Sequence, residues 1–102
     1  MLKVFVRPAA REELAEAFRW YEARAVGLGH EYLRAVRVAF GALERTPELG
    51  PVVLDDIRHL PLARFPYVIY YVVEPAGLSV LAVIHGHRHP RRWQSRRGGY
   101  LG

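Results

Sequence analysis

A chain of 102 residues, 51% of them apolar and 25% charged, has the length and composition of one globular domain. It contains no cysteine, which excludes disulfides and thiolate metal sites, and no apolar run approaches the roughly 20 residues that span a membrane. Because charged residues interrupt the N-terminus before any long apolar stretch, no signal peptide is expected, and the sequence favours a cytoplasmic protein.

The formal net charge of +5 is concentrated near the C-terminus. Acidic residues all precede residue 75, and the segment that follows carries only basic charges, on Arg88, Arg91, Arg92, Arg96 and Arg97. Such a segment can attract phosphate, an acidic protein segment or an anionic surface, although a solvated basic tail is an equally ordinary interpretation. Lys3 is the only lysine, so the preference for arginine runs along the whole chain and is weak support for phosphate binding.

The first residues predict a short strand and then a helix. Residues 2–6 alternate in polarity as a strand does, and Pro8 ends that pattern. Proline suits the first turn of a helix, which the apolar spacing predicts over about 8–25. Glu12 and Glu13 are expected near the positive end of that helix dipole.

A second helix follows after Gly27 and Gly29, which break the first. Its apolar residues recur at helical spacing from Tyr32 to Leu43, and the pattern stops before Pro47, because the residue before a proline disfavours helix. The short link between the two segments predicts an antiparallel helical hairpin.

Beyond Gly50 the apolar period changes from helical to alternating, which predicts three strands. We expect them over 53–60, 65–73 and 78–85, with a turn at Glu74–Gly77 between the last two. Residues 65–73 are apolar or aromatic on both faces, a pattern typical of a central strand that is covered on both sides.

This order of elements predicts a single α+β domain over residues 1–102. It consists of an N-terminal strand, an antiparallel helical hairpin packed on a three- to four-stranded antiparallel sheet, and a short basic C-terminal segment, with residues 98–102 as a flexible tail. Tyr67, Tyr70 and Tyr71 of the central strand are interpreted first as packing residues. The alternative, that one face of this strand lines a groove, stays open.

The densest group of reactive side chains lies at the end of the last predicted strand. His85, His87 and His89 share one face if the strand continues, which would suit zinc, but Pro90 ends the strand and the surrounding arginines repel a cation. No metal is therefore expected. A histidine could instead transfer a proton while Arg88 holds a phosphate, so RNA cleavage is chemically conceivable. The competing interpretation is a recognition surface without chemistry.

Other basic and aromatic residues are candidates for binding. Arg58 and Arg64 flank the loop before the central strand and could join Arg88 at one end of the sheet. Trp93, among arginines, is typical of a base-stacking or protein-contact anchor, unless a short final helix folds it onto the core. The candidate target- or RNA-binding residues are Arg58, Arg64, Arg88, Arg91, Arg92 and Trp93.

Taken together, these patterns resemble the RelE/ParE superfamily of bacterial toxins. The resemblance covers residues 2–97 and rests on the order of elements, on the Phe-Pro-Tyr strand at 64–71, and on the His-x-x-Arg-x-Pro-x-x-Trp ending that closes the segment 80–93. It implies the toxin half of a type II toxin–antitoxin pair, a growth inhibitor that a co-expressed antitoxin wraps and neutralises.

The superfamily divides by mechanism, and the resemblance favours its ParE-like branch. RelE-like members are ribosome-dependent mRNA endonucleases, whereas ParE-like members poison DNA gyrase without a known hydrolytic site. Val68 stands where a RelE-type arginine would fall, and Trp93 stands near the place of a late tyrosine. The basic pair of the preceding strand survives at most as Arg58, and only the late arginine matches, at Arg88.

The resemblance therefore implies a protein-binding toxin, with DNA gyrase as its target and a cognate antitoxin as its inhibitor. The alternative is a ribosome-dependent mRNA endoribonuclease, with the ribosome and mRNA as partners and His85, His87 and Arg88 as catalytic residues. A third hypothesis is an interaction module that has lost its toxicity. None of the three requires a cofactor, a small-molecule substrate or a membrane.

Overall fold

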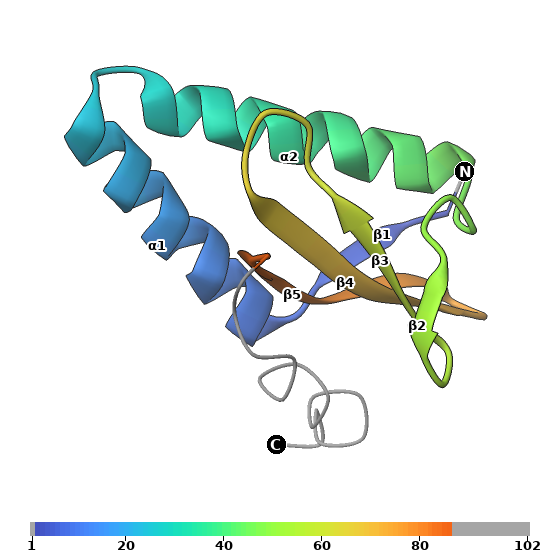
Figure 1. Ribbon diagram of the computed structural model, residues 1–102. Helices are drawn as coiled ribbons and strands as arrows, with labels where there is room; N and C mark the ends of the chain where they lie inside the picture. Colours follow the sequence, from blue (N-terminus) through green and yellow to red (C-terminus); the bar gives the residue numbers. More distant parts are fainter. Residues whose placement is uncertain (1, 87–102) are drawn as a thin grey trace.

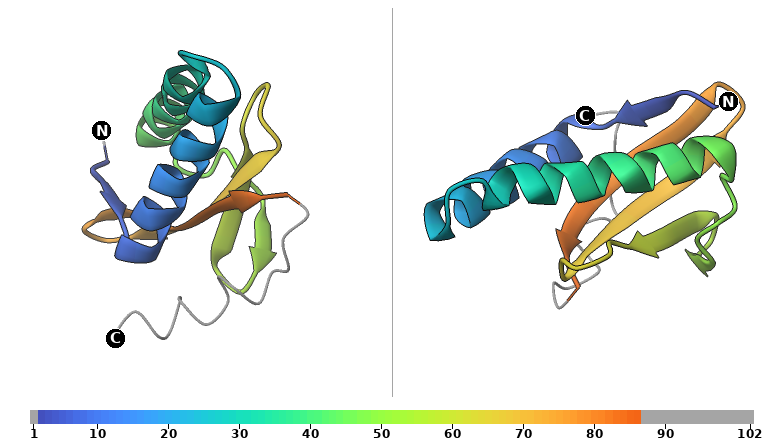
Figure 2. Two further views of the ribbon diagram at one scale, coloured as in Figure 1. Left: turned by 90° about the vertical axis from the view of Figure 1, so that its left-hand side faces the viewer. Right: turned by 90° about the horizontal axis from the view of Figure 1, so that it is seen from above.

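The computed structural model describes residues 2–86, in which two helices lie against one face of a five-stranded sheet (Figures 1 and 2). The elements are β1 (Val4–Val6), α1 (Pro8–Arg24), α2 (Leu28–Arg45), β2 (Val52–Leu54), β3 (Ile57–Pro61), β4 (Tyr67–Glu74) and β5 (Gly77–His85). The predicted α+β class and helical hairpin are confirmed. Neither helix in this part of the chain is long and apolar enough to cross a membrane.

The helical hairpin turns where the glycines interrupt the apolar pattern. Gly27 reverses the chain with a φ of 89°, a left-handed conformation that glycine adopts without steric cost. The Glu22 carboxylate accepts hydrogen bonds from the N–H groups of Gly27 and Gly29, at 2.8 and 2.9 Å, and so ties the end of α1 to the start of α2. The bond from Gly27 is the main reason that the pKa of Glu22 lies below its ordinary value.

The strand order is β1-β5-β4-β3-β2, and one edge differs from the all-antiparallel sheet that the sequence predicted. The pairs from β2 to β5 are antiparallel, but β1 pairs parallel with β5, with Val4 opposite Leu78. The helical hairpin and three strands separate β1 from β5 along the chain, so this pair has the long connection that parallel strands require. The alternation in residues 2–6 carries no information about strand direction.

Residues 53–60 form parts of two strands, where the sequence predicted one. Leu54 of β2 pairs with Ile57 of β3, and Asp55 and Asp56 make the turn between them. Asp55 has a φ of 51°, in the left-handed region that short hairpin turns require and that aspartate tolerates. The two aspartates were therefore a turn signal inside a run of otherwise alternating residues.

Strand β4 is the central strand, as its two-sided apolar pattern predicted. Ile69 and Tyr71 belong to the core that the helices cover, whereas Tyr70 and Val72 alternate toward the opposite face. On that face lies a second, smaller cluster of buried residues, formed by Ile57, Val72, Leu81, Ala82 and Ile84.

The fully buried Tyr71 joins the connection between α2 and β2 to the sheet. Its hydroxyl donates a hydrogen bond to the Pro47 carbonyl oxygen at 2.7 Å and accepts one from the Gly50 N–H at 2.9 Å. Burial raises the pKa of Tyr71, because the phenolate would lose its hydration. Glycine is required at position 50, since a Cβ atom there would collide with the carbonyl oxygen of His59.

Candidate protein-binding cleft

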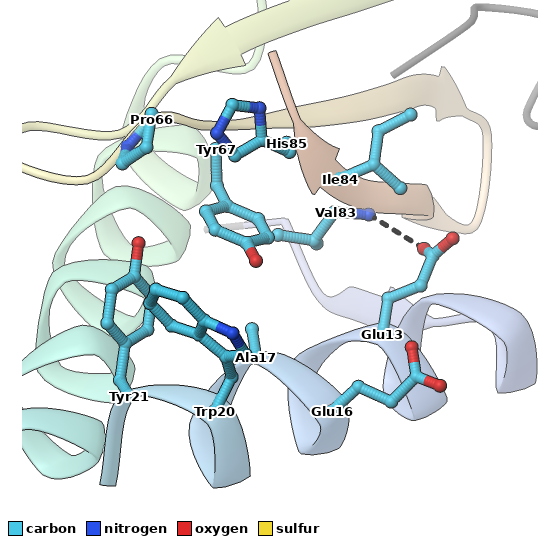
Figure 3. A pocket seen from close by; sticks show the side chains of 10 residues that line it. All are labelled: Glu13, Glu16, Ala17, Trp20, Tyr21, Pro66, Tyr67, Val83, Ile84 and His85. Atoms are coloured by element: carbon cyan, nitrogen blue, oxygen red, sulfur yellow. Dashed lines mark hydrogen bonds between the residues drawn. The ribbon is translucent and has the colours of Figure 1, made fainter. Parts of the chain in front are cut away.

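A cleft of about 620 Å³ opens between α1 and the adjoining ends of β4 and β5 (Figure 3). One stripe of α1 forms the first wall, because residues three or four apart share a helix face. This wall consists of Glu13, Glu16, Ala17, Trp20 and Tyr21. The opposite wall consists of Pro66 and Tyr67 where β4 begins, and of Val83, Ile84 and His85 where β5 ends.

Carboxylates are the main charged groups of the cleft. Glu13 Oε1 accepts a hydrogen bond from the Val83 N–H at 3.0 Å, which holds this side chain against β5 (Figure 3). Glu16 lies on the same stripe of α1 and is exposed. No arginine or lysine is found among the described residues that line the cleft. Within residues 2–86, the lining of the cleft is therefore acidic, in a chain whose formal net charge is +5.

Aromatic rings make up much of the remaining lining. The ring centroids of Tyr21 and Tyr67 lie 6.0 Å apart, and both rings pack on Tyr32, at 5.3 and 5.2 Å. The Tyr32 hydroxyl is buried and has no hydrogen-bond partner within the described chain. Burial also raises the pKa of Tyr32 well above its ordinary value. Trp20, in contrast, is 52% exposed at the cleft, with the Arg24 guanidinium 4.1 Å from its ring centroid.

A second, smaller groove of about 350 Å³ lies between α2 and β3 with the loop that follows it. Its walls are mostly apolar, and Val38 of α2 is 68% exposed there. Its charged groups are of both signs: Arg34, Arg64 and Glu31, with Arg64 Nη2 paired to Glu31 Oε1 at 2.8 Å. This groove therefore carries both positive and negative groups, whereas carboxylates are the main charged groups of the cleft beside α1.

The two described arginines among the predicted binding residues are engaged in separate places. Arg58 Nη1 donates to the carbonyl oxygens of Gly50 at 2.8 Å and Glu48 at 3.3 Å, so it supports the chain before β2. Arg64 pairs with Glu31 of α2 and has a φ of 73°, which is unusual for a residue with a long side chain. The expectation that these two arginines join Arg88 at one end of the sheet stays a prediction, because Arg88 lies outside the described residues.

His85 lies in the cleft, well away from Arg58. Along β4, Tyr67 is opposite His85 and Tyr71 is opposite Arg58, a separation of roughly 13 Å at the rise of a strand. The His85 ring packs edge-on against Tyr67, with centroids 5.6 Å apart. The other predicted site residues, His87, Arg88, Arg91, Arg92 and Trp93, lie outside the described residues.

Over residues 4–90 the sequence matches the family model described as the ParE toxin of the type II toxin–antitoxin system parDE. The chain belongs to the ParE toxin family. Its fold is also similar to a solved structure described as the chromosomal ParDE TA system from P. aeruginosa, with a TM-score of 0.71 and 17% sequence identity, covering 83% of this chain and 96% of that chain. No curated protein matches the sequence significantly. The predicted membership of the RelE/ParE superfamily, closer to ParE, is confirmed.

In this ParE-family chain, reasoning from the sequence missed the carboxylates of the cleft. Glu13 was expected to act on the helix dipole, but the first turn of α1 holds no acidic residue, and Glu13 bonds to Val83 instead. A usable signal was present in the spacing of Glu13, Glu16 and Trp20, which places them on one stripe. The sequence alone could not indicate that the end of β5 faces that stripe.

The metal prediction for this ParE-family chain concerns residues at the boundary of the structure. Within residues 2–86, no three His, Cys, Asp or Glu side chains come together as a metal site would require. His87 and His89 lie outside that range, so the expected independence from metal stays a prediction.

Proposed function

We propose that this ParE-family toxin stops growth by binding DNA gyrase and that a cognate antitoxin neutralises it. Membership of the family over residues 4–90 supports the toxin role. The antitoxin is supported by the description of the structurally similar protein as part of a ParDE system. A net charge of +5 also favours association with an acidic partner.

One observation favours binding over RNA cleavage: Arg58 and Arg64, the two described arginines that could hold RNA, contact parts of the fold other than the cleft that His85 borders. Cleavage requires a group that moves a proton from the attacking 2′-hydroxyl and cations that stabilise the charged phosphorane. Arg58 and Arg64 make their contacts elsewhere in the fold. His85 borders a cleft lined by carboxylates, which repel a phosphate group.

Assays on the purified chain test the target. We expect inhibition of DNA supercoiling by gyrase and gyrase-linked DNA breaks after induction, without codon-dependent cleavage of mRNA on ribosomes. Co-purification with the product of the adjacent reading frame tests the antitoxin. Ribosome-dependent cleavage that one histidine substitution abolishes, in a protein that still folds, would instead make the chain an endoribonuclease.

Substitutions at the C-terminal end separate the two mechanisms further. His85→Ala and His87→Ala, made separately, should retain most growth inhibition. Trp93→Ala combined with Arg91→Ala and Arg92→Ala should abolish it, because aromatic and arginine side chains dominate protein interfaces. Circular dichroism establishes that each variant folds. Loss of toxicity in a histidine variant, with toxicity retained in the triple variant, would contradict the binding mechanism.

A further inference from the structure

The cleft beside α1 has the composition of a site for a cationic side chain. Glu13 and Glu16 offer carboxylates from α1, and the rings of Tyr21 and Tyr67 approach from both walls (Figure 3). Carboxylates bind guanidinium and ammonium groups through charge-assisted hydrogen bonds, and aromatic faces attract the same cations. Trp20 already shows this preference, since it stacks with the guanidinium of Arg24.

The polar groups of the cleft are placed for a ligand from outside. Glu13 is held by the Val83 N–H, so little side-chain entropy remains to be lost when a cation binds. Glu16 is exposed and has no ion-pair partner among residues 2–86.

We propose that this cleft receives an arginine or lysine side chain of the antitoxin, flanked by apolar side chains that pack on Trp20 and Tyr67. The proposal rests on the proposed function in taking the antitoxin as the occupant. Charge complementarity indicates which side chain the cleft binds. A chain with a net charge of +5 favours an acidic partner in general, but the carboxylates of the cleft favour a basic side chain at this one place. One basic residue in an acidic antitoxin segment would therefore set the register of the complex.

Such a site would also discriminate between antitoxins. A partner without the basic residue would cover Glu16 with an apolar surface and leave a desolvated, unpaired carboxylate, which is unfavourable. The cleft would then contribute more to the choice of partner than to the total affinity.

Glu16→Gln tests the proposal, and Glu12→Gln is its matched control. Both changes remove one carboxylate from α1 and alter the net charge equally, but the exposed Glu12 lies outside the cleft. In titration calorimetry with the cognate antitoxin, Glu16→Gln should weaken binding about ten-fold or more, and Glu12→Gln less than about two-fold. Equal effects of the two variants would overturn the proposal.

A small probe tests the cleft independently of the antitoxin. N-acetyl-arginine methylamide, titrated into the full chain, should shift the Trp20 indole resonance, which a Trp20→Phe variant assigns. The uncharged N-acetyl-norleucine methylamide should shift it less, and Glu16→Gln should remove the difference. If both probes shift it equally, the cleft has no preference for cations and the proposal fails. An antitoxin that does not bind the wild-type chain, with this preference intact, would instead contradict the proposed function.

Measurements on the chain without its antitoxin detect other occupants of the cleft. If an arginine of this same chain fills the cleft, Glu16→Gln will lower the melting temperature of the free protein and Glu12→Gln will not. If a second copy fills it, Glu16→Gln will change the sedimentation of the free protein. Either result would overturn the assignment to the antitoxin.

Discussion

Tyr71 and Tyr32 are both fully buried, and they differ in what their hydroxyl groups bind. The Tyr71 hydroxyl bonds to Pro47 and Gly50, whereas the Tyr32 hydroxyl has no partner among the described residues. The substitutions Tyr71→Phe and Tyr32→Phe remove the same atom from the same kind of environment. Their effects on the free energy of unfolding should nevertheless differ in sign.

The magnitudes follow from the hydrogen bonds that are lost. In Tyr71→Phe, the bond to the Pro47 carbonyl oxygen is lost and the Gly50 N–H is left unpaired, which together should cost about 2–3 kcal/mol. For a domain of this size, that loss lowers the melting temperature by roughly 10–20 °C. In Tyr32→Phe, an unsatisfied hydroxyl leaves the core, so stability should be unchanged or rise by up to about 1 kcal/mol.

Equilibrium unfolding in guanidinium chloride, followed by far-ultraviolet circular dichroism, measures both values. The m-values of the two variants should equal that of the parent, which would show that the two-state comparison is valid. A Tyr32→Phe variant as unstable as Tyr71→Phe would refute the reasoning, because it would mean that both hydroxyl groups make bonds that stabilise the fold.

Three further outcomes are expected. Burial raises the pKa values of the core tyrosines Tyr32 and Tyr71, so the folded state keeps protons that the unfolded state loses above about pH 10. The free energy of unfolding should therefore fall as the pH rises above that value. In Tyr32→Phe this fall should be less steep, by up to about 1.4 kcal/mol per pH unit. Glu22→Gln should destabilise the fold at neutral pH, and its difference from the parent should disappear in acid unfolding curves as the pH falls below 4.5 and through the lowered pKa of Glu22. Gly50→Ala should lose about 3 kcal/mol or more in denaturant unfolding, because its Cβ meets the His59 carbonyl oxygen; the control Gly41→Ala, which meets only the end of an arginine side chain, should be neutral or slightly stabilised.

Local signals in the sequence were sufficient for most of the fold. Pro8 and Gly27 marked the bounds of α1 and the turn, and the two-sided apolar run marked β4 as central. Two features were wrong because they depend on geometry beyond a few residues. The parallel pairing of β1 joins it to a strand more than seventy residues further along the chain, and the split between β2 and β3 depended on a left-handed Asp55 within an alternating run.

The candidate site was less accessible to prediction. His85 was singled out by its neighbours in sequence, but its neighbours in space are Tyr67 and residues of α1, more than sixty positions away for Glu16 and Trp20. Arg58 and Arg64 were grouped with Arg88 by charge. In the structure, Arg58 donates to carbonyl oxygens of the chain before β2, and Arg64 pairs with Glu31 of α2. Charge and residue type identify candidates, whereas their convergence is a property of the tertiary fold.

The pairing of Val4 with Leu78 has a consequence for synthesis. During translation the first strand leaves the ribosome early, yet its only sheet neighbour in the described fold, β5, is among the last segments to appear. The nascent chain must therefore keep β1 unpaired until residue 78 and its successors emerge, and non-local pairing of this kind slows folding. A polypeptide released before that point would carry the helices without a complete sheet, so the native surface of the toxin can exist only once nearly the whole domain has been made.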